Sequence, residues 1–249
     1  MKALVTGASA GIGRDIARAL AKRGYDLVLV ARREDRLAEL KNELNVNVET
    51  LPLDLSSPEN CYELYDRMEG QTIDILVNNA GFGVFGGFLE TDLPRELEMM
   101  DTNMKAVHIL TKLFLNKFKA RDSGYILNVA SSAAFFSGPL FSSYYASKAY
   151  VLRLTEAIWQ ELREDKSNVY IGALCPGPVR TEFGKVAHAD IGVTSGLTSE
   201  YVAEYTLRKM FRRKRVIVPG GMMKAARFFS KILPDKLLLK AVYALQSRK

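Results

Sequence analysis

Cysteine, histidine and tryptophan are scarce in this chain of 249 residues, which has two cysteines, two histidines and one tryptophan. The cysteines, Cys61 and Cys175, form no CxxC pair, and so few histidines cannot complete the usual zinc-ligand patterns. We therefore expect no metal site. Two cysteines also fit a reducing compartment such as the cytosol, where disulfides are rare.

Long hydrophobic runs are missing as well. No stretch reaches the roughly 18 consecutive apolar residues that a membrane-spanning helix needs. The apolar run at the N-terminus ends at Thr6, which is too early for the hydrophobic region of a signal peptide. These absences predict a cytoplasmic protein.

Acidic residues are almost absent from the last part of the chain. Residues 208–249 contain 13 Lys and Arg but one acid, Asp235, whereas the rest of the chain contains 22 basic and 27 acidic residues. The overall net charge of +7 therefore comes from this C-terminal part. Because the body of the chain is slightly acidic, we expect no nucleic-acid partner.

The sequence does contain a regular alternation of short apolar runs and amphipathic stretches. The runs are nearly continuous in Val, Ile and Leu, as in strands buried on both faces of a parallel sheet. They span 3–7, 26–31, 48–54, 74–80, 124–131, 169–177 and 215–220. The amphipathic stretches span 12–23, 34–44, 57–69, 95–119, 143–164 and 198–213. This alternation predicts an α/β fold with a single doubly wound, Rossmann-like domain, a parallel sheet of about seven strands and helices on both faces.

We expect this domain to occupy residues 1–221 and a basic amphipathic extension to occupy 222–249. Apolar residues of the extension recur at helical spacing and could form one face: Leu237, Leu238, Ala241, Val242 and Leu245. The expected structure is a helical hairpin, broken at Pro234 and packed on the domain. Two functional alternatives are a peripheral contact with a membrane surface and a lid over an anionic or apolar substrate.

A glycine-rich turn, VTGASAGIG, follows the first predicted strand and opens the first helix. Gly7, Gly11 and Gly13 would allow a tight turn and a close approach of the backbone to a pyrophosphate, which the helix N-terminus attracts. Ser9 and Ile12 belong to the same turn. Because a dinucleotide site requires this context, we expect all five residues to bind a cofactor. An ordinary glycine-rich turn is the alternative.

Two arginines at the end of the second predicted strand bear on the choice of cofactor. NAD sites place an acid there for the ribose hydroxyls, but this chain has Arg32 and Arg33. A guanidinium can pair with the 2′-phosphate of NADP(H), so we predict NADP(H) as the cofactor. The alternative is that both arginines are solvated charges at the start of a helix, partly neutralised by Glu34 and Asp35.

Six motifs follow one another along the chain: TGxxxGxG at Thr6–Gly13, NNAG at Asn78–Gly81, an asparagine at Asn103, a serine at Ser131, YxxxK at Tyr144–Lys148 and PG at Pro176–Gly177. With these motifs in this order, the chain resembles the short-chain dehydrogenase/reductase family over about residues 2–220. Many NADP-using members carry a basic residue just before the second motif glycine, where this chain has Ala10. The two arginines would then bind the 2′-phosphate alone.

The resemblance implies that Asn103, Ser131, Tyr144 and Lys148 are the catalytic residues. Hydride transfer to a carbonyl develops charge on its oxygen, which needs a nearby proton donor such as Tyr144. The pKa of a free phenol is near 10, and we expect the Lys148 ammonium, one helical turn away, to lower it. By resemblance, Ser131 orients the substrate oxygen and Asn103 holds a water that links Lys148 to solvent.

Two neighbouring residues compete with this assignment. Tyr144 and Tyr145 both face Lys148 at helical spacing, so spacing alone does not separate them. The family places its tyrosine 13 residues after the serine, which selects Tyr144 with Ser131. Ser132 would lie on the opposite strand face. Tyr145 is therefore assigned to packing or to a subunit interface.

The resemblance also implies further cofactor contacts. They are Asp54, Leu55, Asn79, Ala80, Gly81, Tyr144, Lys148, Pro176, Gly177, Val179 and Thr181. Asn78 is expected to support the sheet near the cofactor. Phenylalanines near the catalytic tyrosine indicate an apolar substrate pocket, with core or subunit contacts as the alternative: Phe82, Phe85, Phe88, Phe135, Phe136 and Phe141. The polar segment 183–200 is the predicted substrate lid.

These features predict an NADP(H)-dependent oxidoreductase that interconverts a carbonyl and an alcohol. The predicted substrate is a small hydrophobic ketone or a 3-oxoacyl-type compound. A non-catalytic NADP-binding regulator is the alternative, although such proteins usually lose the tyrosine or the lysine. Sugar-nucleotide epimerases and dehydratases have another glycine spacing and a longer C-terminal domain. The resemblance also implies a homodimer or homotetramer formed through the helices at 95–119 and 143–164.

Overall fold

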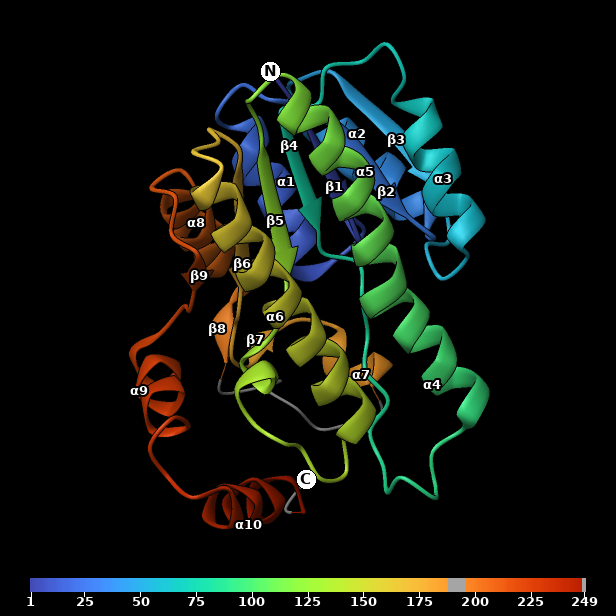
Figure 1. The fold of residues 1–249 in the computed structure, drawn as a ribbon. Coiled ribbons are helices and arrows are strands. Elements are labelled where there is room, and N and C mark those ends of the chain that lie inside the picture. Colours follow the sequence, from blue (N-terminus) through green and yellow to red (C-terminus); the bar gives the residue numbers. More distant parts are fainter. Residues whose placement is uncertain (188–195, 248–249) are drawn as a thin grey trace.

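A seven-stranded parallel sheet forms the centre of the molecule (Figure 1). The computed structural model describes residues 1–187 and 196–247. The strands are β1 (Lys2–Thr6), β2 (Asp26–Ala31), β3 (Val48–Pro52), β4 (Ile75–Asn78), β5 (Tyr125–Val129), β6 (Tyr170–Leu174) and β9 (Val216–Ile217). Their order is β3-β2-β1-β4-β5-β6-β9, with every pair parallel. The predicted fold class and all seven predicted strands are confirmed.

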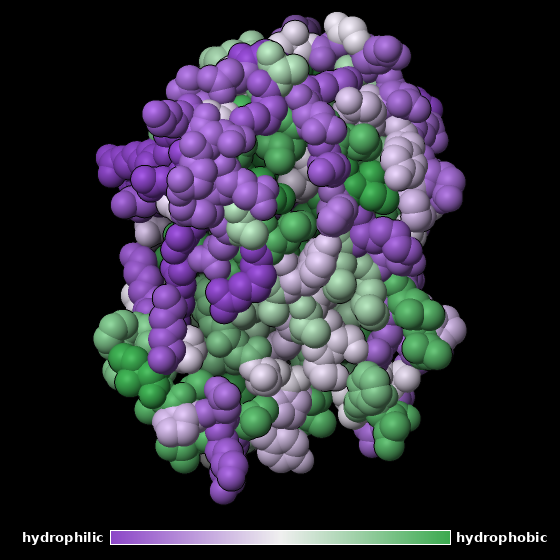
Figure 2. Space-filling view, in the orientation of Figure 1, coloured by the Kyte–Doolittle hydropathy of each residue, from purple (hydrophilic) through white to green (hydrophobic). Residues whose placement is uncertain are grey.

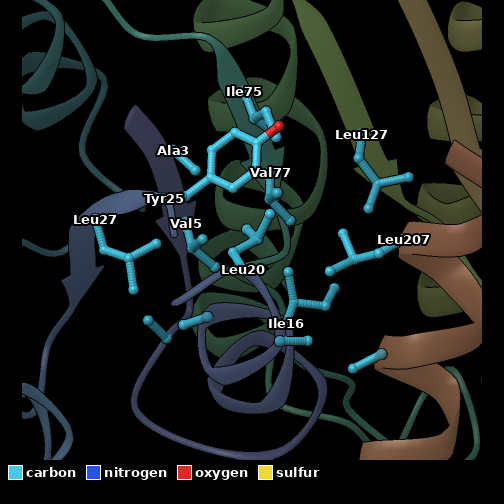
Figure 3. Packing of buried hydrophobic residues seen from close by; sticks show 14 of the residues in the cluster. Ala3, Val5, Ile16, Leu20, Tyr25, Leu27, Ile75, Val77, Leu127 and Leu207 are labelled. Atoms are coloured by element: carbon cyan, nitrogen blue, oxygen red, sulfur yellow. The ribbon is translucent and has the colours of Figure 1, made fainter. Parts of the chain in front are cut away.

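Helices cover both faces of the sheet. On one face lie α1 (Gly11–Ala21), α2 (Glu34–Glu43) and α8 (Ser199–Met210), and on the other lie α3 (Pro58–Arg67), α5 (Val107–Ala120) and α6 (Ser142–Glu164). Figure 3 shows the first core, where Ile16 and Leu20 of α1 meet Val5 and Val77 of the sheet. Leu4, between Ala3 and Val5, faces the core on the other side of the sheet, beneath α3, α5 and α6. Burial on both faces explains why the strands are apolar at successive positions.

The predicted helix at 95–119 is divided into three parts. Helix α4 (Leu93–Met100) passes into a π-helical segment, Asp101–Ala106, before α5 begins at Val107. The apolar periodicity continues through this region, so it could not reveal the change of helix type. In the π-helical turn Asn103 is fully buried and bonds the main chain of Phe82. Such local widening of a helix is frequent at functional sites.

Three short elements after β6 were not predicted. Strands β7 (Val179–Arg180) and β8 (Leu197–Thr198) form a separate two-stranded sheet, and α7 spans Phe183–Val186. Two-residue strands carry too little periodicity to be recognised in a sequence. Residues 188–195 of the predicted lid at 183–200 lie outside the described residues, so the lid remains a prediction.

The C-terminal extension forms two helices, α9 (Gly221–Phe229) and α10 (Asp235–Gln246), and the break at Pro234 is confirmed. The expected packing is mostly wrong. Helix α9 buries no residue and α10 buries only Gln246. Of the predicted apolar face only Leu238 and Val242 are half-buried. Figure 2 shows the resulting hydrophobic surface at the lower end of the molecule, where Figure 1 places both helices.

Among the described residues, none of the helices combines the length and the apolar character that crossing a bilayer requires.

Candidate active site

A cavity of about 620 Å³ opens at the carboxyl ends of the strands. The order of the sheet reverses between β1 and β4, and ligands of doubly wound folds bind at that point. Most of the predicted site residues line this cavity: Gly7, Ser9, Gly11, Ile12, Arg32, Arg33, Asp54, Leu55, Asn79, Ala80, Gly81, Ser131, Tyr144, Lys148, Pro176, Gly177, Val179 and Thr181. Gly13 and Asn103 are the two that do not.

The glycine turn is held from below by Asn79. Gly7 and Gly11 have φ values of +64° and +54°, which residues with a Cβ rarely adopt. The Asn79 amide donates to the carbonyls of Thr6 (2.9 Å) and Gly7 (3.1 Å). A Cβ on Gly13 would lie 2.4 Å from the Gly7 carbonyl oxygen, so Gly13 packs behind the turn rather than on the cavity wall. Its predicted cofactor contact remains a prediction.

Arg33 joins the glycine turn to the end of β2. Its Nε and Nη2 donate to the Ser9 hydroxyl at 3.3 and 3.2 Å, and its Nη1 pairs with Glu182 at 2.9 Å. This hydrogen bond holds the pKa of Glu182 below its usual value. Arg32 pairs instead with Glu98 at 2.8 Å and lies 3.6 Å from Asp54. Both guanidiniums thus have carboxylate partners that only the fold brings to them.

Tyr144 is buried and fixed at the cavity wall. Its ring stacks on Phe141, with 4.5 Å between the centroids. Burial raises the pKa of Tyr144 to about 12, and a hydrogen bond with the Ser131 side chain partly opposes this rise. The expected lowering by Lys148 is therefore wrong in direction. The Lys148 Nζ lies 5.9 Å from the centre of the ring and donates to the carbonyl of Val129 at 3.0 Å.

Lys148 is only 4% exposed. Burial lowers its pKa to about 8, because a charged ammonium is poorly solvated there. A Cβ on Gly81 would lie 3.2 Å from Lys148 Nζ and 2.6 Å from Asn103 Oδ1, so these two groups flank Gly81. Asn103 also donates to Ser147 Oγ at 3.1 Å. Asn103 therefore lies behind the wall of the cavity, beside the lysine.

Ser131 has one bond that marks it out from Ser132. Strand β5 ends at Val129, so the rule of alternating strand faces does not reach either serine, and Ser132 also lines the cavity. The Ser131 oxygen accepts a hydrogen bond from the Ala133 N–H at 3.1 Å. The Ser131 side chain also opposes the rise in the pKa of Tyr144, which places it near that phenol. Proximity to the tyrosine, rather than strand geometry, therefore favours Ser131 over Ser132.

The aromatic wall differs in part from the prediction. Phe82 and Phe141 line the cavity, whereas Phe88 is 68% exposed. Phe135 and Phe136 do not line it. Asn78 bonds Thr111 and Asn128, which ties β4 to β5 and α5 below the cavity.

Sequence reasoning missed several lining residues: Arg95, Thr102, Tyr145, Glu182, Phe183 and Gln246. Tyr145 was assigned to packing or to an interface, but it lines the cavity and accepts a hydrogen bond from Gln246 at 2.6 Å. Its side-by-side position with Tyr144 was a usable signal. Gln246 carries no such signal, because nothing in the sequence connects it with residues about a hundred positions earlier.

This fold, with a cavity at the carboxyl ends of its strands, is typical of oxidoreductases that bind a dinucleotide. Residues 1–192 match the family described as short chain dehydrogenase, and the chain belongs to that family. A mouse very-long-chain 3-oxoacyl-CoA reductase is 31% identical, with 96% of this chain and 82% of the relative covered.

Solved structures of the family have the same fold. A short-chain dehydrogenase from Sphingobium yanoikuyae in complex with NADPH is 31% identical, with a TM-score of 0.82 over 94% of this chain and 96% of the other. A short-chain dehydrogenase/reductase from Burkholderia phymatum in complex with NAD is 26% identical, with a TM-score of 0.84 over 90% of each chain. Both nicotinamide cofactors thus occur among structures similar to this one.

Proposed function

We propose that the protein is an NADPH-dependent reductase that converts a hydrophobic ketone or a 3-oxoacyl compound into the alcohol. The observation that carries this proposal is that Ser131, Tyr144 and the buried Lys148 stand together in the wall of one cavity. These side chains line the same cavity as the glycine turn and Arg33. A proton donor and a dinucleotide site therefore share one space.

The side chains divide the proton chemistry between them. When bound, NADPH would supply the hydride that adds to the carbonyl carbon. With a pKa of about 12, Tyr144 keeps its proton at neutral pH and can give it to the carbonyl oxygen. Ser131 would donate a hydrogen bond that holds this oxygen in place. Lys148 is mostly charged below pH 8, and its positive charge would stabilise the phenolate that Tyr144 leaves.

The residues at the adenosine end fit NADP(H). The Arg33 guanidinium and the Ser9 hydroxyl lie together at the cavity wall and offer several donors for a 2′-phosphate. The Sphingobium structure, which holds NADPH, supports this choice. Arg32 would add charge at the same place, while Asp54 and Leu55 would contact the adenine and Lys148 the nicotinamide ribose.

Arg33→Asp is expected to weaken NADPH far more than NADH. Loss of a charge-assisted bond to the phosphate should raise the KM for NADPH by about 10- to 100-fold, since such a bond contributes about 1.5–3 kcal/mol. The KM for NADH should change by less than about threefold, because NADH lacks the phosphate. Arg36→Asp is the matched control, since Arg36 does not line the cavity. Equal effects on both cofactors would contradict the proposed preference.

The rest of the cavity suits an apolar substrate. Phe82, Phe141 and Phe183 line it close to Tyr144, and Phe183 lies 5.4 Å from the Tyr144 ring. The name of the mouse relative supports a 3-oxoacyl substrate class. A loss of NADPH absorbance on addition of ketones, aldehydes or 3-oxoacyl thioesters would test the function. NADPH binding without reduction of any of these compounds would favour the alternative, a non-catalytic regulator.

We also propose a homodimer or homotetramer formed through α5 and α6. These long helices lie side by side in Figure 1, and His108 Nδ1 of α5 is 2.6 Å from Tyr150 Oη of α6. Light scattering on the purified protein would give the mass of the assembly.

We also propose that the protein is cytoplasmic and that its extension makes a peripheral contact with an anionic membrane surface. Exposed apolar side chains, including Met222, Phe228, Phe229, Ile232 and Leu237, alternate with lysines on α9, on α10 and in the segment between them. Residues 221–247 have five basic side chains and one acid, so two copies would repel each other, while anionic lipid would attract them.

Co-sedimentation with vesicles tests this contact. The protein should bind vesicles that contain phosphatidylglycerol and not vesicles of phosphatidylcholine alone, and salt should weaken the binding. The double variant Phe228→Ser, Phe229→Ser should reduce binding by about a hundredfold or more, because burial of two phenylalanine side chains contributes about 3 kcal/mol or more. Phe88→Ser, at an exposed position elsewhere, is the control. Absence of binding by the unaltered protein would refute the contact.

A further inference from the structure

Gln246 connects the C-terminal extension with the active site. It stands at the end of α10, is 5% exposed and is the only buried residue of that helix. It lines the same cavity as Tyr144 and Tyr145. The inner side of α10 is therefore part of the cavity wall, although its outer side is exposed.

The hydrogen bonds of Gln246 are incomplete. Its Nε2 donates to the Tyr145 hydroxyl oxygen at 2.6 Å. Its Oε1 is buried and accepts no hydrogen bond from any described residue. Because buried polar atoms normally have partners, an orphaned amide oxygen at a cavity wall indicates a bond that another molecule completes. The Tyr145 oxygen accepts from Gln246, which leaves the Tyr145 hydrogen available for donation.

The pair is held beside the proposed proton donor. The rings of Tyr144 and Tyr145 lie 6.2 Å apart at 74°. A Cβ on Gly138 would lie 2.3 Å from the Tyr145 ring, so Gly138 lies flat against that ring and limits its movement. Phe141 contacts both tyrosines. The Gln246–Tyr145 pair thus places two polar groups in a fixed position beside the aromatic rings of Phe141 and Tyr144.

We propose that Gln246 and Tyr145 form a substrate subsite for a second polar group, a hydroxyl or a secondary amide, next to the carbonyl that is reduced. Gln246 supplies a hydrogen-bond acceptor and Tyr145 supplies a donor. A substrate hydroxyl or secondary amide fits this pair, because each of these groups can both donate and accept a hydrogen bond. The subsite rests on the proposed function, because it assumes a carbonyl at Tyr144. It narrows the substrate class to apolar carbonyl compounds that carry such a group.

Matched pairs of ketones test the subsite. One pair is para-hydroxybenzylacetone and benzylacetone; the other is S-acetoacetyl-N-acetylcysteamine and S-butyl thioacetoacetate, which lacks the amide. The unaltered enzyme with NADPH should show a kcat/KM about tenfold or more higher for the polar member of at least one pair, the effect of about one added hydrogen bond. Gln246→Leu should bring this ratio close to one, while reduction of the apolar member continues.

Two further variants separate a subsite from a structural role. Gln246→Glu keeps an acceptor and should retain part of the preference, which general loosening of α10 would not explain. Leu245→Ala, at a 65% exposed neighbouring position, should leave the ratio unchanged. Equal ratios in the unaltered enzyme and in Gln246→Leu would overturn the subsite and leave the proposed function intact.

Calorimetric titration of the same ketones into the NADPH-loaded protein distinguishes the two proposals, because it needs no turnover. Selective binding of the polar member without reduction would contradict the reductase and support the subsite. Equal binding of both members by the unaltered protein would overturn the subsite.

Discussion

Tyr144→Phe is expected to lower kcat for carbonyl reduction by about a hundred- to ten-thousandfold, the usual contribution of a positioned acid. The substitution removes the phenolic hydroxyl and leaves the ring in its stack with Phe141. The affinity for NADPH should therefore change little. Steady-state rates at saturating ketone, together with NADPH binding by fluorescence, would measure both quantities.

The neighbouring tyrosine provides the control. Tyr145→Phe should keep most of the turnover of an apolar ketone, because its hydroxyl is bonded to Gln246 and not to Ser131. If Tyr145→Phe abolished turnover and Tyr144→Phe did not, the roles of the two residues would have to be exchanged.

Lys148→Met is expected to abolish reduction and yet to stabilise the fold at pH 7. The pKa of Lys148 is lowered by burial from 10.5 to about 8, so the folded state is penalised for holding the ammonium. Methionine has a similar length and no charge. Loss of the bond to the Val129 carbonyl offsets part of the gain, and the net increase in the free energy of unfolding should be about 1–2 kcal/mol. Denaturant titration would measure it.

The pH dependence has a definite sign. Below pH 8 Lys148 is charged in both the folded and the unfolded state, so burial of the ammonium destabilises the fold in full. Above pH 10.5 Lys148 is neutral in both states, so this destabilisation is absent. Between these values the stability of the unaltered protein should therefore gain a contribution as pH rises, and this contribution should be missing from Lys148→Met. Lys148→Arg, which stays charged, should be no more stable than the unaltered protein at pH 7. A destabilised Lys148→Met at pH 7 would show that the ammonium is better solvated than its burial indicates.

Much of the site follows from the sequence because parallel strands end at one edge. Gly7 follows β1, Arg32 follows β2 and Ser131 follows β5, and continuous apolar runs identify these strands. Once the strands are known, the residues after them must lie near one another. The spacing of Tyr144 and Lys148 on one helix needs no tertiary information at all.

The amino-acid sequence by itself thus determined the doubly wound sheet, the glycine turn and the set of residues at its carboxyl edge, because these depend on local periodicity. Only the tertiary structure decided that Arg33 bonds Ser9 and Glu182 and that Gln246 reaches Tyr145, pairs separated by 24, 149 and 101 positions. It also reversed the expected pKa shift of Tyr144, since burial disfavours the charged phenolate. Burial is set by every element packed around a group, and no stretch of sequence contains that information.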